Sequence, residues 1–248
     1  MSVTNPRLRT ISFGDLDGAV WGAALDAGGP SIVFATPDGT GAAAGPDAVR
    51  WSEADGGWTL AGRGFELSIA VTRAGEPDPT PDAAPAGVMT DDLCHVSGTL
   101  TVAGAEHRVQ CVGTCSVADG VDPRRLDSVR GVSGWFADQQ AVSLLALRPA
   151  DRSSQERDVV GATLFDLEGR VAVNEPRLST TYSHGTPTRT NLELWIGEGE
   201  EQFPRRAGGE ARGPGAEAGS DGFTLQVTPL RCRAGGLDGA GVYLLARF

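Results

Sequence analysis

The chain has 248 residues, 40% of them hydrophobic, with 35 Gly, 15 Pro and a formal net charge of −11. All 21 basic residues are Arg, against 32 acidic residues. Nucleic acids and anionic membranes attract clustered positive charge, so this composition argues against such partners. The lack of Lys excludes a Lys Schiff base and a P-loop lysine.

In chain order, short runs with alternating hydrophobicity or β-branched residues predict antiparallel strands separated by Gly, Pro and Asp turns. About eight such runs occur in the first half, near residues 9–13, 18–26, 30–36, 48–53, 57–62, 65–73, 93–103 and 106–117. Residues 74–87 are rich in Pro and Asp and are expected to form a long exposed loop. The glycine run at 39–45 does not have the spacing of a dinucleotide-binding fingerprint.

Strand patterning lapses at 119–127, DGVDPRRLD, where one helical turn is expected. We therefore predict two domains, residues 1–120 and 121–248. The second half again has about eight strand-like runs, near 129–137, 140–148, 158–167, 169–182, 188–197, 203–211, 222–233 and 240–248. A polar loop is expected at 208–222.

Gly, Pro and β-branched residues interrupt every helical pattern longer than two turns, so the sequence argues against a parallel α/β fold. The sequence predicts an all-β protein of two consecutive antiparallel barrels, about eight strands each, packed side by side. Barrel closure or packing would protect the sheet edges, and any edge left exposed makes a homodimer plausible.

The first fifteen residues lack the apolar stretch of a signal peptide, and no run of about eighteen apolar residues occurs, so we predict a cytoplasmic protein without a membrane span. Cys94, Cys111, Cys115 and Cys232 match neither a zinc ribbon nor a CxxC pair and are expected to be buried thiols. Neither GxSxG nor HExxH is present, and the histidines are not at metal-ligand spacing, so no metal or cofactor is expected.

Three segments carry a family resemblance: RGVSGWFADQQAVSLLALRP at 130–149, PRLSTTYSHGTPTRTNLELW at 176–195 and FPRRAGGE at 203–210. They resemble bacterial tandem lipocalin-like proteins related to the carotenoid 1,2-hydratase group. The resemblance implies two calycin-type barrels side by side and activity on polyene or terpenoid chains, as hydratases, cyclases or Diels–Alder catalysts. Many relatives carry a Gly-His-Arg and Trp-Gly cluster where this sequence has Gly113-Thr114-Cys115, so the His and Trp are missing here.

The second half offers a candidate proton donor on the strand at 188–197. Alternation places Asn191, Glu193 and Trp195 on one face of it. If that face lines a cavity, Glu193 is a desolvated acid beside ligand-binding Asn191 and Trp195; alternatively, Glu193 is solvated and Trp195 packs at the domain interface. Tyr182 and His184 end the preceding strand as further catalytic candidates, unless they are merely solvated at a loop tip.

In the first half, Asp91, Asp92 and His95 could form an acid-base group with His95 touching the ligand, or the two Asp could simply cap a turn. Trp21 and Trp135 are predicted ligand-binding residues. The alternative is that both pack as core, although Trp135 follows Gly134 and could instead cover a cavity mouth.

These patterns lead to three functional hypotheses. The first is a cofactor-independent cyclase, isomerase or hydratase for a hydrophobic polyene-like or polyketide-like metabolite, bound in a barrel or between the halves. The second is a non-catalytic carrier of a hydrophobic small molecule. The third is an interaction module whose barrels are filled by side chains.

Overall fold

The computed structural model describes residues 7–72, 88–136, 140–150, 158–166, 169–197, 203–220 and 222–248. Within them the chain is all-β, with one short 3-10 helix, η1 (Pro123–Arg125), which is the helical turn expected between the halves. The loop predicted at 74–87 lies outside the described residues. No helix in these ranges is long and apolar enough to cross a membrane.

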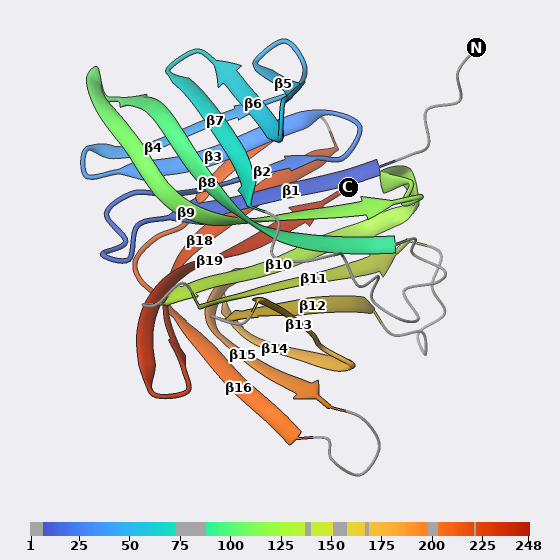
Figure 1. Cartoon of the computed structure of the whole chain (residues 1–248). Helices are drawn as coiled ribbons and strands as arrows, with labels where there is room; N and C mark the ends of the chain where they lie inside the picture. The colour runs from blue at the N-terminus through green and yellow to red at the C-terminus, as the bar shows by residue number, and fades with distance from the viewer. Residues whose placement is uncertain are drawn as a thin grey trace.

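The N-terminal half, here meaning strands β1 to β9, forms one antiparallel sheet in the order β4-β3-β2-β1-β9-β8-β7-β6-β5. Its sheet curls strongly, as Figure 1 shows for the blue, cyan and green strands. The strands are β1 (Arg7–Gly14), β2 (Trp21–Asp26), β3 (Pro30–Thr36), β4 (Gly39–Ala44), β5 (Val49–Ala54), β6 (Gly57–Gly62), β7 (Phe65–Thr72), β8 (Val88–Val102) and β9 (Ala105–Asp119).

The C-terminal half, strands β10 to β19, forms a second antiparallel sheet in the order β13-β12-β11-β10-β19-β18-β16-β15-β14, with β17 paired to β18. Its strands are β10 (Leu126–Phe136), β11 (Ala141–Pro149), β12 (Val159–Asp166), β13 (Gly169–Ala172), β14 (Glu175–Ser183), β15 (Thr186–Ile196), β16 (Phe203–Ala211), β17 (Ala216–Ser220), β18 (Phe223–Ala234) and β19 (Leu237–Arg247). The two curled sheets confirm the predicted all-β fold of two consecutive barrel-like units. The division into domains at residue 120 stays a prediction.

Three differences from the predicted strands have local causes. Strand β4, GTGAAA, has no hydrophobic alternation, yet it pairs with β3. The ring of Phe34 packs on Gly41 so closely that a Cβ added there would lie only 2.4 Å from it. Strand β17 lies inside the segment predicted as a polar loop, because it pairs with the strand that follows it. The single run predicted at 169–182 is two strands, β13 and β14, at two different positions in the sheet.

The apolar side chains separate into three clusters, because alternation gives each strand two faces. One cluster fills the inside of the N-terminal half and includes Phe13, Phe34 and Phe65. A second fills the inside of the C-terminal half. The third lies between the halves and combines residues of both, such as Trp21 and Trp135.

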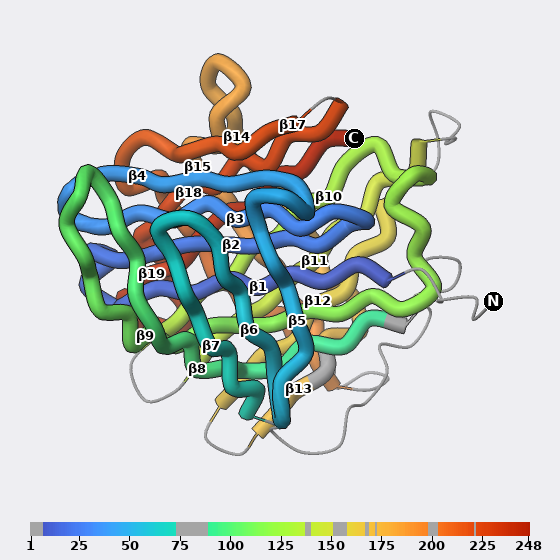
Figure 2. The backbone as a smooth tube through the Cα atoms, turned by 90° about the horizontal axis from the view of Figure 1, so that it is seen from above, coloured from blue at the N-terminus to red at the C-terminus, as the bar shows by residue number. Residues whose placement is uncertain are grey.

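The halves meet over a broad face. Strands β1, β2 and β3 contact β18 or β19, and β17 lies along β3 and β4, as seen from above in Figure 2. On the other side, β8 contacts β12, and β9 contacts β10 and β11. Strands of both halves therefore build one broad interface around the apolar cluster that they share.

Candidate functional site

A buried polar network joins the two halves at the centre of their interface. Asp91 on β8 lies opposite Ser116 on β9, and both face Ser143 and Thr163, which are opposite each other on β11 and β12. The Asp91 carboxylate accepts hydrogen bonds from Ser116, from Ser143 at 3.1 Å and from Thr163 at 2.9 Å. The sequence placed Asp91 in an acid-base group or a turn cap, whereas the structure places it inside a β-strand between the sheets.

The environment of Asp91 changes its acidity. Burial raises the pKa of its carboxyl, although the three hydroxyl hydrogen bonds and the charge of Arg170 act in the opposite direction. The next residue, Asp92, pairs directly with Arg170 on β13, so adjacent carboxylates of the N-terminal half both bond to the C-terminal half. A further hydrogen bond of 2.7 Å crosses the interface from Thr114 to Ser133.

Next to this network, the interface opens into a groove of about 420 Å³, a size common for small-molecule sites. Its location follows from the strand ladder. Leu93 lies on the same face of β8 as Asp91, and the pair of His95 and Val112 follows on that face farther along β8 and β9. The groove is lined from the N-terminal half by Leu16, Leu93, His95 and Val112, and from the C-terminal half by Trp135, Phe136 and Ala141.

The groove wall is apolar and reaches the surface. Leu16 is 49% exposed and Val112 is 37% exposed, and both belong to the few large hydrophobic side chains that the described residues leave open to solvent. Leu16 follows β1 in a turn whose Asp17 carbonyl accepts a hydrogen bond from Arg212 of the other half. The C-terminal half thereby helps to position a wall that the N-terminal half contributes.

Few polar groups of the groove are available for chemistry. The Asp15 carboxylate accepts hydrogen bonds from the backbone N–H of Ala19 at 2.8 Å and of Val20 at 3.2 Å, so it holds the turn. Burial, with Asp15 nearby, raises the pKa of the Cys111 thiol to about 11, which keeps it protonated at neutral pH. The remaining polar side chains on the N-terminal wall are those of His95, Gln110, Thr72 and Cys94.

The structure brings three of the predicted ligand-binding residues to this region. His95 lies exposed in the groove, and Trp135 is buried in its wall, where its indole N–H has no hydrogen-bond partner among the described residues. Trp21 is buried nearby in the core between the halves, and both tryptophans approach Gly14, where a Cβ would lie 3.3 Å from Trp135 and 3.5 Å from Trp21. Roles for these residues in ligand binding stay predictions.

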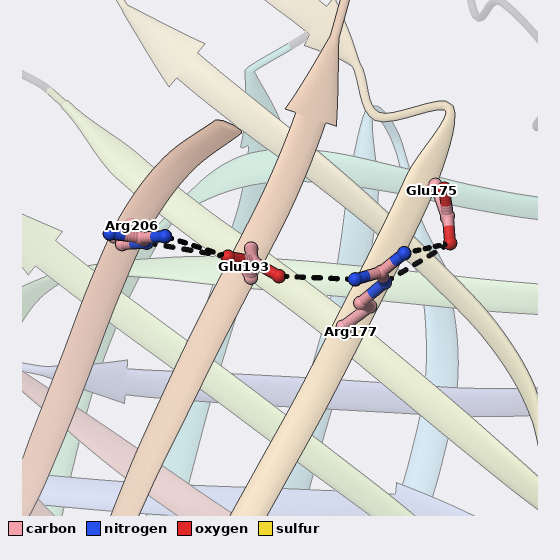
Figure 3. A network of polar contacts seen from close by, with 4 residues as sticks. All are labelled: Glu175, Arg177, Glu193 and Arg206. Atoms are coloured by element: carbon pink, nitrogen blue, oxygen red, sulfur yellow. Dashed lines mark hydrogen bonds and ion pairs between the residues drawn. The ribbon is translucent and has the colours of Figure 1, made fainter. Parts of the chain in front are cut away.

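The other candidates from strand β15 lie elsewhere. Asn191, Glu193 and Trp195 alternate with Leu192, Leu194 and Ile196, which are buried inside the C-terminal half, so the candidates are on the outer face of the sheet. Glu193 accepts hydrogen bonds from Arg206 at 3.1 Å and Arg177 at 3.3 Å, as Figure 3 shows.

Of the two alternatives for Glu193, the structure therefore shows the solvated carboxylate, although Trp195 lies on the outer face of the sheet and not at the domain interface. A catalytic role for Glu193 stays a prediction. The hydrogen bond from Arg206 is the main reason that the pKa of Glu193 is lowered rather than raised. Arg177 also pairs with Glu175 and lies 5.8 Å from the ring centre of Trp195. This open network favours an ionised carboxylate, whereas a general acid needs a proton near neutral pH.

The remaining two candidates lie at the hairpin that joins β14 to β15. His184 has φ of 50° and is followed by Gly185 with φ of 81°, the backbone of a tight two-residue hairpin turn, and its ring is exposed. The Tyr182 hydroxyl lies 2.7 Å from the hydroxyl of Tyr243, which is buried inside the C-terminal half. Neither residue lines the groove, so catalytic roles for them stay predictions that this geometry does not favour.

The four thiols are all buried and none of them is in a disulfide, as the sequence predicts. Among the described residues, no group of three or more His, Cys, Asp or Glu side chains could hold a metal ion. Of the residues that line the groove, sequence reasoning proposed His95 and Trp135 for the site and missed the others, such as Leu16, Leu93 and Val112. Only an apolar residue at an outward-facing position hinted at them, and single exposed apolar residues are common.

No family model matches the sequence, and no curated protein sequence matches it. The fold is similar to that of CghA, with a TM-score of 0.70 and 13% identity over 98% of this chain and 88% of CghA. A structure of CghA with Sch210972 gives a TM-score of 0.67 and 12% identity over the same shares of the two chains. An AttH-like protein from Nitrosomonas europaea gives 0.63 and 12% identity, over 99% of this chain and 93% of that one. At such identities the comparison shows the fold, which supports a lipocalin-like tandem-barrel architecture.

Proposed function

We propose that the chain binds a hydrophobic small molecule in the groove between its halves and promotes cyclisation, isomerisation or hydration of that molecule without a cofactor. The observation that carries the proposal is the groove itself: about 420 Å³, apolar walls from both halves, and exposed Leu16 and Val112 at its opening. One similar structure, that of CghA, holds Sch210972, which agrees with small-molecule binding in this fold.

The groove suits shape-based catalysis better than acid-base catalysis. An apolar cavity can hold a flexible chain in a folded, reactive conformation, which lowers the entropic part of a ring-closing barrier. For a proton-transfer step, His95 is the groove residue whose exposed imidazole offers both a hydrogen-bond donor and an acceptor. Loss of His95 should therefore leave a shape-based cyclisation largely intact and remove a hydration or a double-bond shift.

A carrier without catalysis is the second candidate. It is favoured by the small number of polar groups in the groove whose lone pairs or protons are free, since Asp15 is bonded to its own turn. The two candidates agree on where the ligand binds, so one binding experiment tests both.

The first test measures binding of diphenylhexatriene, a neutral fluorescent polyene, to the wild type, Val112→Arg and Thr101→Arg. Val112 lies in the groove, whereas Thr101 is exposed on the same face of the N-terminal sheet outside it. We expect Val112→Arg to weaken binding at least tenfold, because a long charged side chain enters an apolar site. Equal binding by all three proteins would contradict the proposed site.

The second test separates enzyme from carrier. The protein is incubated with a linear polyene extract, and the bound and released species are compared by chromatography and mass spectrometry. Cyclisation or isomerisation changes retention at constant mass, and hydration adds the mass of one water. A ligand released unchanged at all incubation times establishes a carrier.

A further inference from the structure

A second pocket opens at the inner side of the C-terminal half. It measures about 700 Å³, and Leu164 and Leu194 line it with other side chains of the inner apolar cluster. Phe136, Gln140 and Ala141 line both this pocket and the groove between the halves, so the two cavities are neighbours. Figure 1 shows β12 and β16 on opposite sides of this curled sheet.

An arginine with no partner among the described residues lies at the rim of this pocket. Arg205 on β16 is paired in register with Leu194, which is completely buried inside the sheet, so Arg205 is on the inner face. It lines the pocket, and no hydrogen bond or ion pair to its guanidinium is found among the described residues. The next residue, Arg206, has its guanidinium bound to Glu193 on the outer face.

An exposed aromatic ring accompanies this arginine. Phe203 is paired in register with buried Ile196, so it lies on the same inner face as Arg205, nearer the end of the strand. It is 50% exposed, the largest value among the exposed large hydrophobic residues of the described ranges. Asp166 also lines the pocket, but it already takes part in an interaction of its own.

We propose that the pocket of the C-terminal half binds an anionic amphiphile, with the apolar chain against Leu164 and Leu194 and the carboxylate on Arg205. A guanidinium matches a carboxylate with two parallel hydrogen bonds, and Arg205 has both donors to offer. A protein with a net charge of −11 repels anions overall, so a cation that has no partner among the described residues and lies beside an apolar cavity marks where an acid can enter. This site is distinct from the groove of the proposed function.

The test compares dodecanoate with dodecanol, which has the same chain and no charge, by calorimetric titration of the wild type, Arg205→Gln and Arg231→Gln. Arg231 is the matched control, because it is an exposed arginine on the neighbouring strand β18, on the outer face of the sheet, opposite to its buried neighbour Cys232. Arg205→Gln should weaken dodecanoate binding about tenfold and dodecanol binding less than about twofold, as expected when a charge-assisted hydrogen bond is lost. Arg231→Gln should change neither.

Three outcomes overturn the proposal: no binding of dodecanoate to the wild type, equal weakening by both Arg variants, or equal loss of dodecanol and dodecanoate in Arg205→Gln. Because Arg205 is exposed, its substitution is expected to leave the fold intact, which circular dichroism checks. Val112→Arg separates this site from the groove. If it weakens diphenylhexatriene but not dodecanoate, the two sites are independent; if it weakens dodecanoate equally, the acid binds in the groove and the second site is absent.

Discussion

The interface between the halves and the outer face of β14 to β16 each hold a carboxylate surrounded by hydrogen-bond donors, yet the two are opposite in chemistry. Asp91 in the interface is 5% exposed and is bonded to neutral hydroxyls, so burial raises its pKa. Glu193 on the outer face is bonded to two arginines in solvent, and its pKa is lowered.

The difference shows which surroundings raise the pKa of a carboxyl group and which lower it. Hydroxyl donors satisfy a carboxylate without supplying charge, so desolvation outweighs them. Arginines supply charge, and solvent removes most of the desolvation penalty. On an alternating strand such as β15, the glutamate that faces outward joins a surface network, because the buried face is taken by leucine and isoleucine side chains.

The largest expected effect comes from removing the buried carboxylate. Asp91→Ala deprives the hydroxyls of Ser116, Ser143 and Thr163 of their acceptor, so we expect a loss of about 2 to 3 kcal/mol in the free energy of unfolding. Asp91→Asn keeps the shape and one acceptor oxygen and should lose less. Urea unfolding at neutral pH measures both, and equal losses would argue against the hydrogen-bond network as the cause.

The pH dependence of stability sharpens the comparison. Unfolded Asp91 releases its proton near pH 3.9, whereas the folded protein retains it to higher pH, so the stabilisation is complete at low pH and is lost as pH rises. Relative to Asp91→Asn, the wild type should lose up to about 1.4 kcal/mol per pH unit above that value, until the folded-state pKa is reached. Parallel pH profiles for the two proteins would contradict the raised pKa.

A smaller effect is expected at the single hydrogen bond between Thr114 and Ser133. Thr114→Val removes a donor 2.7 Å from its acceptor and leaves Ser133 unpaired on that side, which should cost about 1 kcal/mol. Thr101→Val, at an exposed position of the same sheet, is the control and should be close to neutral. Thermal unfolding of both variants measures the difference.

The smallest effect is expected on the outer face. Glu193→Gln should lower the unfolding midpoint only slightly near neutral pH, because exposed pairs with Arg177 and Arg206 contribute little. Since the pKa of Glu193 is lowered, the wild-type advantage exists above the unfolded pKa and disappears as pH falls through the folded one. It should also disappear in about 1 M NaCl, where charges are screened within about 3 Å. A large, salt-independent loss would mean that Glu193 is desolvated after all.

Strand positions were largely predictable from the sequence, because they depend on local alternation and on turn residues. Strands β1, β3, β6 and β16 lie within two residues of the predicted runs. Strand β4 and strand β17 were missed, since neither alternates and each forms only because a neighbouring strand supplies hydrogen-bond partners.

The sequence by itself determined most of the strands and the two faces of each, and it predicted the buried state of the four thiols. Only the tertiary structure decided which face of β15 is inside, that Asp91 meets two strands of the other half, and that Leu16, Val112 and Trp135 border one groove. The physical reason is the distance along the chain over which each effect acts. Alternation and turn preference act between neighbouring residues, whereas burial and pKa depend on residues that are brought together only when the two sheets pack.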